Sequence, residues 1–499
     1  MPVLTPHMQP PPQAADMPSP VSARIGGETP ICVDLDGTVI LTDSLHDSAA
    51  AAAFSNWATL WQLPGWLLRG RATLKRKLAE RWQFDPALLP YNEDLIALLR
   101  AEKARGRRIV LATASDEIIA KKIAAHLGIF DEILASDGRT NLRGSRKADA
   151  LCARFGTGQF AYAGNDAPDH AIWRRAGQAL VVNASNSVRK AAGKQYSNAA
   201  FIGQRANPLP AFVRALRPYQ WVKNLFVLVP LFTSGGIADL NAWLQSLAAL
   251  AAFCAVASAI YLLNDLGDLA ADRAHPRKRN RPFANGTLSV ASGLAAAPVL
   301  ALFGAWLGIW SGAWLALAIY AALSLAYTIR LKEAPLVDVF ILAALYTLRL
   351  QGGGEASGHP VSLWLLGFSS FLFLSLALVK RVSELLRLQL SGTVKSAARR
   401  GYHVQDQQIL QIFGVGATFA SAVVLSLYVQ SSSALEIYHR PSVLWGLIPL
   451  MLFWQCRLWL STARGYMHDD PIVYAARDWV SWMVFASAAA LMIFAGIRI

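Results

Sequence analysis

Long apolar stretches recur through the second part of this 499-residue chain, and they restrict its fold more than any other feature. From about Trp221 onward, apolar runs of about 17–22 residues alternate with short polar segments. An α-helix of that length crosses a hydrocarbon core about 30 Å thick. We therefore expect an all-α bundle of about nine membrane-spanning helices. The expected spans are residues 222–238, 243–263, 288–304, 312–329, 335–350, 361–379, 408–430, 443–462 and 479–498.

Positive charge gathers on one side of these expected spans. The segments at 264–287, 328–334, 380–407 and 463–478 carry fifteen Lys and Arg residues, whereas the segments expected on the opposite side carry only Arg440. Such an excess marks the cytoplasmic side of a membrane protein. The net charge of +15 thus reflects topology, and we expect no nucleic-acid partner. We expect a location in the inner (cytoplasmic) membrane, with the N-terminal domain and the basic segments in the cytoplasm.

The first 200 residues have a different character, with charge dispersed among short apolar runs. Alternating strand and helix patterns there predict a doubly wound α/β domain with parallel strands. The four cysteines form no CxxC pair, which argues against a disulfide framework or a zinc site. The expected organisation is a disordered terminus at 1–27, an α/β domain at 28–203 with a helical cap at about 45–95, a linker and interfacial segment at 204–221, and a membrane domain at 222–499.

Two acids follow the first expected strand of the α/β domain. The sequence PICVDLDGTVILTD predicts a short buried strand that ends before Asp34 and Asp36. Because residues two apart in a strand point the same way, both carboxylates can reach one Mg²⁺ and one phosphoryl group. One aspartate can then attack phosphorus while the other handles the proton of the leaving group. Gly37 permits the tight turn that follows.

This DxDGT motif resembles the haloacid dehalogenase (HAD) superfamily of phosphohydrolases. The resemblance implies phosphate contacts from Thr113, at the end of a second strand, and from Lys147. It also implies metal binding by Asp34 and Asp36 together with acids after a third strand, which here are Asp166 and Asp169. Asn165 stands where the family usually has aspartate, and an amide is a weaker Mg²⁺ ligand. A regulatory or docking role for this domain therefore remains an alternative to phosphatase activity.

The expected cap combines tryptophans with a basic cluster that includes Arg71 and Lys75. Aromatic and basic residues together suit a membrane surface with anionic lipids. Ordinary core packing beneath a solvated helix face explains the same residues equally well, so both interpretations remain open.

A second acidic motif, NDLGDLAADRAHPRKRNRP, directly follows the second expected span. If the helix continues past the span, its acids share one face, because residues four apart stack along a helix. Acids so close repel each other unless a divalent cation neutralises them, and Mg²⁺ commonly keeps a phosphate oxygen among its ligands. The bases that follow supply positive charge for phosphate. The polar residues concerned are Asn264, Asp265, Asp268, Asp272, Arg273, Lys278, Arg279 and Arg281.

The spacing of these residues resembles the first signature of the UbiA superfamily of intramembrane prenyltransferases, and the resemblance covers roughly residues 210–499. It implies that Asp265 and Asp268 hold Mg²⁺ on a diphosphate and promote departure of that diphosphate from carbon. Two further aspartates would support the metal. They are Asp272 and Asp338.

The second signature of the superfamily usually has two or more aspartates, but here it has only Asp338. With Tyr327 and Lys332 in the same segment, it resembles the branch typified by decaprenyl-phosphate phosphoribosyltransferase. In that branch phosphoribosyl diphosphate is the donor and a polyprenyl phosphate is the acceptor. Similar segments at RPYQWVKNLFVLVP and LALVKRVSEL imply further phosphate contacts. These are Lys223, Lys380 and Arg381.

These resemblances predict two activities in one membrane enzyme. The first is Mg²⁺-dependent transfer of 5-phosphoribosyl to a polyprenyl phosphate, and the second is removal of the 5-phosphate of the product by the HAD domain. An alternative is an aromatic prenyltransferase that joins a polyprenyl diphosphate to an acceptor such as 4-hydroxybenzoate, with a HAD domain that is regulatory or acts on another phosphate ester. The last polar segment adds three residues that either bind metal or phosphate or cap the final helix. They are His468, Asp469 and Asp470.

Overall fold

The computed structural model describes residues 28–499 except 57, 235, 392–400, 468–469 and 497–499. The expected disordered terminus at 1–27 lies outside these residues, as do His468 and Asp469. Contacts divide the chain into two compact units, which are residues 1–211 with 266–291, and residues 212–265 with 292–499. The first unit is therefore discontinuous in sequence, because it includes most of the second acidic motif.

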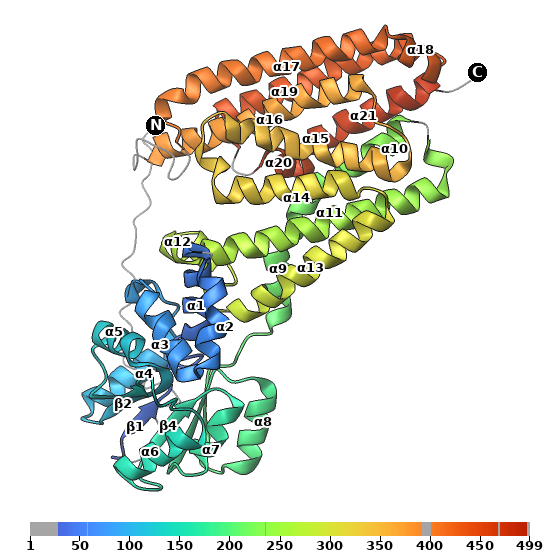
Figure 1. Cartoon of the computed structure of the whole chain (residues 1–499). Helices are drawn as coiled ribbons and strands as arrows, with labels where there is room; N and C mark the ends of the chain where they lie inside the picture. Colours follow the sequence, from blue (N-terminus) through green and yellow to red (C-terminus); the bar gives the residue numbers. More distant parts are fainter. Residues whose placement is uncertain (1–27, 57, 235, 392–400, 468–469, 497–499) are drawn as a thin grey trace, which may run out of the picture. The chain divides into compact units, whose positions relative to one another are not determined.

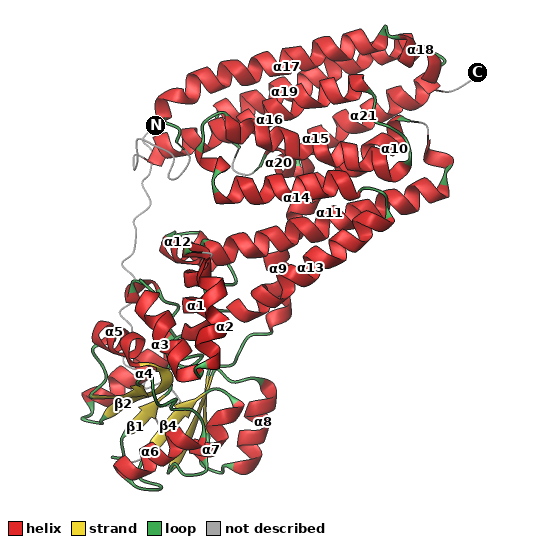
Figure 2. Cartoon of the chain, viewed as in Figure 1, coloured by secondary structure: helices red, strands yellow, loops and turns green. Residues whose placement is uncertain are grey.

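A six-stranded parallel sheet forms the centre of the first unit (Figure 2), in the order β3-β2-β1-β4-β5-β6. The strands are β1 (Ile31–Val33), β2 (Ile109–Asp116), β3 (Glu132–Ser136), β4 (Ala161–Gly164), β5 (Gln178–Val182) and β6 (Ala200–Ile202). Side chains alternate across the sheet, so Ile31 and Val33 join one apolar core while Cys32 joins another. Burial on both faces explains why these strands are short, continuous apolar runs. The predicted doubly wound α/β domain is confirmed.

Eight α-helices accompany this sheet within residues 28–203, apart from the one undescribed residue there. They are α1 (Ser44–Ser55), α2 (Ala58–Leu68), α3 (Arg71–Arg81), α4 (Glu93–Ala104), α5 (Glu117–Leu127), α6 (Ser145–Phe155), α7 (His170–Trp173) and α8 (Asn186–Gln195). Their sequences contain ordinary stop and start signals. The side chain of Asn92 caps α4 by accepting from the amide of Leu95, and Gly128 ends α5 in the left-handed conformation.

The second unit is helical. The remaining helices of the chain are α9 (Pro208–Leu216), α10 (Val229–Thr233), α11 (Leu240–Gly267), α12 (Leu269–Ala274), α13 (Val290–Trp310), α14 (Trp314–Ile329), α15 (Val337–Ser357), α16 (Leu363–Ser391), α17 (Gln407–Val429), α18 (Ser432–Ile437), α19 (Leu447–Ala463), α20 (Pro471–Arg477) and α21 (Trp479–Gly496). Within the second unit, α16 packs along α17, and α15 packs between α14 and α16 (Figure 1).

Six helices of the described residues are long and apolar enough to cross a membrane, so the expected count of nine is not confirmed. The first expected span is replaced by a 3₁₀ helix, η4 (Pro218–Leu228), followed by the five-residue α10. Pro218 and Pro230 explain part of this difference, because proline removes a backbone donor that a long α-helix would use. Helix α13 exposes large apolar side chains such as Leu302 and Ile309, as expected of a helix that faces lipid.

Replacement of Leu99 by alanine tests the core of the first unit. Leu99 on α4 has no exposed surface and belongs to the core that includes Ile31 and Ile109. Its truncation leaves a cavity that the close-packed core cannot fill, so we expect Leu99→Ala to lower the free energy of unfolding of this unit by about 2–5 kcal/mol. Hydrogen exchange of the β2 amides in the purified full chain would measure the loss. Arg100→Ala, at the exposed neighbouring position, should change protection little, and equal effects would contradict the prediction.

Candidate functional site

The reversal of strand order at β1 places the expected phosphatase residues together. Strands β2 and β4 lie on either side of β1, so their carboxyl ends meet at one edge of the sheet. The backbone amide of Asp34 donates to the carbonyl of Ala163 at 2.9 Å, which joins the end of β1 to β4. Gly37 has φ +72°, and a Cβ atom there would collide with the Asn165 side chain. The turn after the two acids therefore requires glycine.

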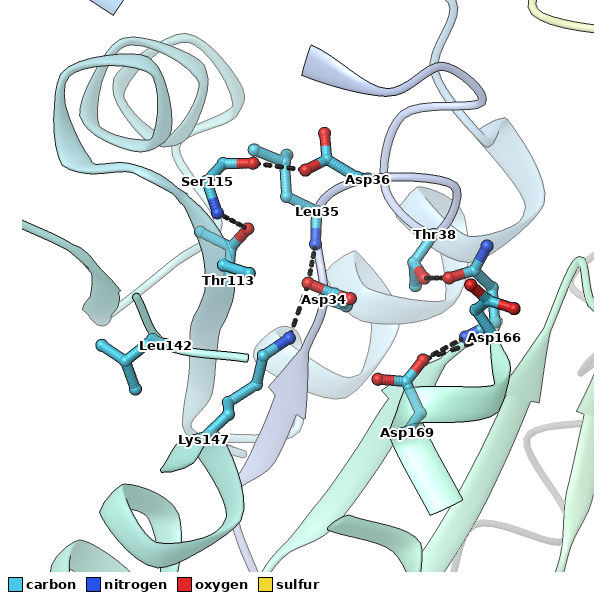
Figure 3. Close-up of polar contacts among 12 residues, drawn as sticks. Asp34, Leu35, Asp36, Thr38, Thr113, Ser115, Leu142, Lys147, Asp166 and Asp169 are labelled. Carbon is cyan, nitrogen blue, oxygen red and sulfur yellow. Dashed lines mark hydrogen bonds and ion pairs between the residues drawn. The ribbon is translucent and has the colours of Figure 1, made fainter. Parts of the chain in front are cut away.

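Lys147 contacts the first of these acids (Figure 3). Its Nζ lies 2.9 Å from Oδ1 of Asp34 and also donates to the hydroxyl of Tyr162 at 2.9 Å. The Tyr162 hydroxyl donates in turn to Asp169 at 3.2 Å. Lys147 is buried at the start of α6, so its ammonium is held in one position. This arrangement would let one cation contact both the attacking carboxylate and a phosphoryl oxygen.

Asp36 lies in a hydrogen-bonded pocket next to Asp34. Its carboxylate accepts from the hydroxyl of Ser115 and, at 2.7 Å, from the amide of Ser44. Burial, with a smaller contribution from the charges of Asp43 and Asp34, raises the pKa of Asp36 to about 7. A carboxyl group with such a pKa can both give and take a proton near neutral pH, as a general acid–base must.

Thr113 also lies at the end of β2, where its hydroxyl accepts from the amide of Ser115 at 3.0 Å. The structure therefore brings together four of the residues that the sequence assigned to phosphate chemistry. These are Asp34, Asp36, Thr113 and Lys147. Sequence reasoning missed Ser115, although it stands two residues after Thr113 and therefore on the same side of the strand.

Of the acids after β4, Asp169 is held by hydrogen bonds from neighbouring protein groups. One oxygen of Asp169 accepts from the amides of Asn165 and Asp166 at 2.9 and 3.1 Å, and the other accepts from Tyr162. Burial and the charge of Asp34 raise the pKa of Asp169 to about 6. Asp166 and Asp34 line one cavity. No group of three or more His, Cys, Asp or Glu side chains in the described ranges is arranged to hold a metal. Two carboxylates with phosphate and water can satisfy Mg²⁺, and Asp34 and Asp166 are the candidates here.

Asp34, Asp36, Lys147, Asp166 and Asp169 line a cavity of about 780 Å³ in the first unit. Four further cations also line it. They are Arg71, Lys75, Arg143 and Arg205. The segment after α12 also contributes Gly286, Thr287 and Ser289 to the wall. Gly286 has φ +75° and lies so close to Leu41 that a Cβ atom would meet the Leu41 backbone.

A buried ion pair joins the second acidic motif to the rest of the first unit. The guanidinium of Arg273, on α12, lies 2.8 Å from Oδ2 of Asp47 on α1, and both side chains are almost fully buried. Asp47 also accepts from Thr42 at 2.8 Å, and Arg273 donates to the carbonyl of Ala284 at 3.2 Å. Arg273, which was expected to contact phosphate, thus anchors this segment. Arg281 of the same motif lies 2.6 Å from Asp272.

Removal of one member of this pair tests its role. Asp47→Ala would leave the guanidinium of Arg273 buried without its carboxylate, which costs about 3–5 kcal/mol. We expect hydrogen exchange of the amides at 269–290 to increase and the thermal midpoint of the first unit to fall. Replacement of both residues by apolar ones, in Asp47→Leu with Arg273→Met, should recover much of the loss. An Arg279→Ala control, at an exposed position of the same segment, should leave both measurements unchanged.

The helix that carries the motif does not continue without interruption, contrary to the expectation. Helix α11 ends at Gly267, and α12 begins at Leu269, with Asp268 between them outside the helical region of backbone space. In the second unit, Asp265 is buried in an ion pair with Arg217, whose guanidinium lies 5.0 Å from the ring centre of Tyr261. Asn264 and Asp268 are partly exposed.

Two cations contact the buried carboxylate of Asp470 in the second unit, and of these Lys223 is buried and Lys380 is partly exposed. The Nζ atoms of Lys223 and Lys380 lie 2.7 and 3.3 Å from its Oδ2, and the hydroxyl of Tyr346 lies 3.3 Å from its Oδ1. Lys223 and Asp470 come from segments almost 250 residues apart, so the sequence alone did not pair them. Two lysines against one carboxylate leave a net positive charge, which suits an anionic ligand.

Next to this group, Arg349 donates to the amide oxygen of Asn224 at 2.7 Å and to the hydroxyl of Tyr320 at 3.2 Å. Asn224 follows Lys223 directly on η4. Arg349, which is buried, therefore adds a third cation beside the first two. Neither Asn224 nor Arg349 was among the predicted phosphate contacts.

Asp338 and Arg381 form a separate buried group. One carboxylate oxygen of Asp338 accepts from Arg381 and the other from the hydroxyl of Tyr402. Arg381 also pairs with Glu384. Both oxygens of Asp338 contact protein groups. This geometry suits a role in positioning Arg381 better than it suits a role as a metal ligand. The other predicted phosphate contacts are partly or fully exposed. They are Lys278, Arg279, Tyr327 and Lys332.

Comparison with known proteins also divides the chain into two parts. Residues 226–465 match the UbiA prenyltransferase family, and residues 31–164 match the haloacid dehalogenase-like hydrolases. A decaprenyl-phosphate phosphoribosyltransferase of Mycobacterium tuberculosis is 36% identical over 228 residues, which are 44% of this chain and 73% of that protein. This chain belongs to the UbiA prenyltransferase family. Its N-terminal part is a HAD-like hydrolase domain, and the whole is a multi-pass integral membrane enzyme.

Other relatives match more of the chain. The uncharacterized protein y4nM of Sinorhizobium fredii is 37% identical over 474 residues, which are 93% of this chain and 91% of that protein. The nodulation protein NoeC of Azorhizobium caulinodans is 36% identical and matches 58% of this chain and 94% of its own length. Among solved structures, a UbiA homolog from Archaeoglobus fulgidus bound to GPP and Mg²⁺ has a TM-score of 0.44 at 16% identity, and covers 56% of this chain and 99% of that one.

Proposed function

We propose that the UbiA-like part transfers 5-phosphoribosyl from phosphoribosyl diphosphate to a polyprenyl phosphate. The observation that carries this proposal is the family membership, with several decaprenyl-phosphate phosphoribosyltransferases at 36–38% identity. The cations around Asp470 support it, because donor and acceptor together carry four phosphate groups. The lipid phosphate oxygen would form a bond to C1 of ribose while the bond from C1 to the diphosphate breaks.

Both families are generally Mg²⁺-dependent. Bound Mg²⁺ would neutralise charge on the departing diphosphate, and Asp265 and Asp268 are the residues we assign to it, with Asp272 in support. Lys223 and Lys380 would bind phosphate oxygens, and Arg349 would hold Asn224 beside them. Asp338 would keep Arg381 oriented rather than bind the metal itself.

We further propose that the HAD-like domain removes the 5-phosphate from the ribosyl lipid. Asp34 would attack phosphorus, and the ester bond to the 5-oxygen would break as the Asp36 carboxyl group protonates that oxygen. Water would then attack the aspartyl-phosphate while the Asp36 carboxylate takes its proton, which releases inorganic phosphate. Lys147 and Thr113 would hold the phosphoryl oxygens. Bound Mg²⁺, held by Asp34 and Asp166, would offset the negative charge of the phosphoryl group.

We place this domain and the basic segments on the cytoplasmic side of the inner membrane. The asymmetric distribution of Lys and Arg between the expected loops supports this orientation. Phosphoribosyl diphosphate is a soluble, highly charged donor, and a cytoplasmic site gives it direct access.

The transferase assignment predicts a strong effect at Asp268. We expect Asp268→Ala to lower the formation of radiolabelled ribosyl lipid from phosphoribosyl diphosphate and polyprenyl phosphate by at least about 100-fold, because it removes charge that would stabilise the leaving group. Full-length protein in detergent would be assayed by extraction of labelled lipid. Glu436→Gln, an exposed change on α18, is the control and should keep normal activity. Product formation from a prenyl diphosphate and 4-hydroxybenzoate instead would contradict the assignment.

The phosphatase assignment predicts a separate effect at Asp34. We expect Asp34→Asn to lower phosphate release from the phosphoribosyl lipid by at least about 1,000-fold, because an amide cannot form the aspartyl-phosphate. Transfer of phosphoribosyl to the lipid should continue, so the lipid that still carries the 5-phosphate should accumulate. Mass spectrometry of the lipid product would distinguish the two forms. If Asp94→Asn, an exposed change at the start of α4, has the same effect, the assignment is incorrect.

A further inference from the structure

The cavity of the HAD-like domain is lined by cations besides the one that contacts Asp34. Lys147 already contacts Asp34 at the carboxyl end of the sheet. A second set of cations lines the same cavity from the cap helix α3 and from the segment before α6. These are Arg71, Lys75 and Arg143. Within the described part of the chain, none of the three forms a salt bridge with an acidic side chain.

Lys75 is held in place by neutral groups. Its Nζ donates to the carbonyl of Ala114 at 2.5 Å and to the amide oxygen of Asn141 at 3.1 Å. An ammonium has three donors, and these contacts account for two of them. Burial lowers the pKa of Lys75, the charges of Asp36 and Asp43 oppose this shift, and those of Arg143 and Lys147 add to it. Arg143 lines the same cavity, so an anion there could be bound by both cations.

The rim of the cavity shows what kind of molecule carries that anion. Leu67 of α2 lines the cavity and is 52% exposed, and Leu68 beside it is 90% exposed. One to two turns earlier on the same helix, Trp61 is 79% exposed. A soluble phosphate ester has no apolar surface to bury against these side chains, whereas a polyprenyl chain would remove them from water. The cap helices thus present cations inside the cavity and apolar surface at its edge.

We propose that Lys75 and Arg143 form a second anion site, which binds the phosphodiester of a lipid-linked substrate while Asp34 attacks the terminal phosphate. Arg71 adds charge at the start of α3. This inference rests on the proposed function and extends it, because it names the residues that distinguish a ribosyl lipid from a simple sugar phosphate. Leu67 and its neighbours on α2 accept the first part of the lipid chain.

The test compares three substrates with the full-length protein in detergent. They are ribose 5-phosphate, the same sugar joined at C1 to methyl phosphate, and the same sugar joined at C1 to farnesyl phosphate. Release of inorganic phosphate gives kcat/KM for each. We expect the wild type to prefer the farnesyl compound over ribose 5-phosphate by at least tenfold, and over the methyl compound as well. Equal rates with the methyl and farnesyl compounds would overturn the lipid-linked part of the proposal.

Substitutions then locate the second anion site. In Lys75→Met and in Arg143→Met, the preference for the farnesyl compound over ribose 5-phosphate should fall at least tenfold. Lys75→Arg, which keeps the charge, should retain most of the preference. The matched controls are Lys77→Met, whose lysine pairs with Glu80 on the same helix, and Arg146→Met, an exposed change on α6 outside the cavity. Both controls should keep the wild-type preference.

The outcomes separate the two proposals. In one outcome the protein releases phosphate and keeps its preference for the farnesyl compound in both Lys75→Met and Arg143→Met. That result would overturn the second anion site and leave the phosphatase assignment intact. If the wild type releases no phosphate from any of the three compounds, the phosphatase assignment and the second anion site both fail.

Discussion

The change of strand order at β1 is the constraint on which the phosphatase site depends. Parallel strands place all their carboxyl ends at one edge, and the reversal at β1 leaves a gap there between the helices on either side. Asp34 and Asp36 emerge at that point, and β2 supplies Thr113 and Ser115 from one side. The close turn at Gly37 then brings Asn165, after β4, against the same acids. The charge of Asp34 contributes to the raised pKa of Asp36 and of Asp169, and Lys147 offsets that charge by its contact with Asp34.

The second unit also holds charged side chains close together, although its helices are mostly apolar. Cations outnumber acids at one place there, where the buried Lys223 and the partly exposed Lys380 share Asp470. Burial of unpaired charge is expensive and is usually retained for function. The neighbouring Asp338, by contrast, is fully occupied by Arg381 and Tyr402. The two groups therefore differ. The lysines at Asp470 keep positive charge for a ligand, whereas Asp338 holds the side chain of Arg381 in position.

The sequence predicted the parts of this protein that rest on local pattern. Short apolar runs ending in acids predicted the α/β domain, and the positions of Asp34 and Lys147 followed from motif spacing. Long-range pairings could not be predicted in the same way. Nothing in the sequence near Lys223 indicates Asp470, and nothing near Arg273 indicates Asp47. The expected count of nine spanning helices is not confirmed. Hydropathy registers apolar content, whereas prolines such as Pro218 and Pro230 affect whether that content forms one long α-helix.

The discontinuity of the first unit has a consequence for how the two parts of the protein are related. All six strands precede residue 203, so the whole sheet of the HAD-like domain has been synthesised by that point. Its cavity, however, receives Gly286 and Ser289 from chain made some 80 residues later, and α1 receives Arg273 from the same segment. The domain cannot finish folding until the first long helix of the membrane part has been made. The first unit is therefore not a separate module at the N-terminus, because its own structure includes residues 266–291 from within the membrane part of the sequence.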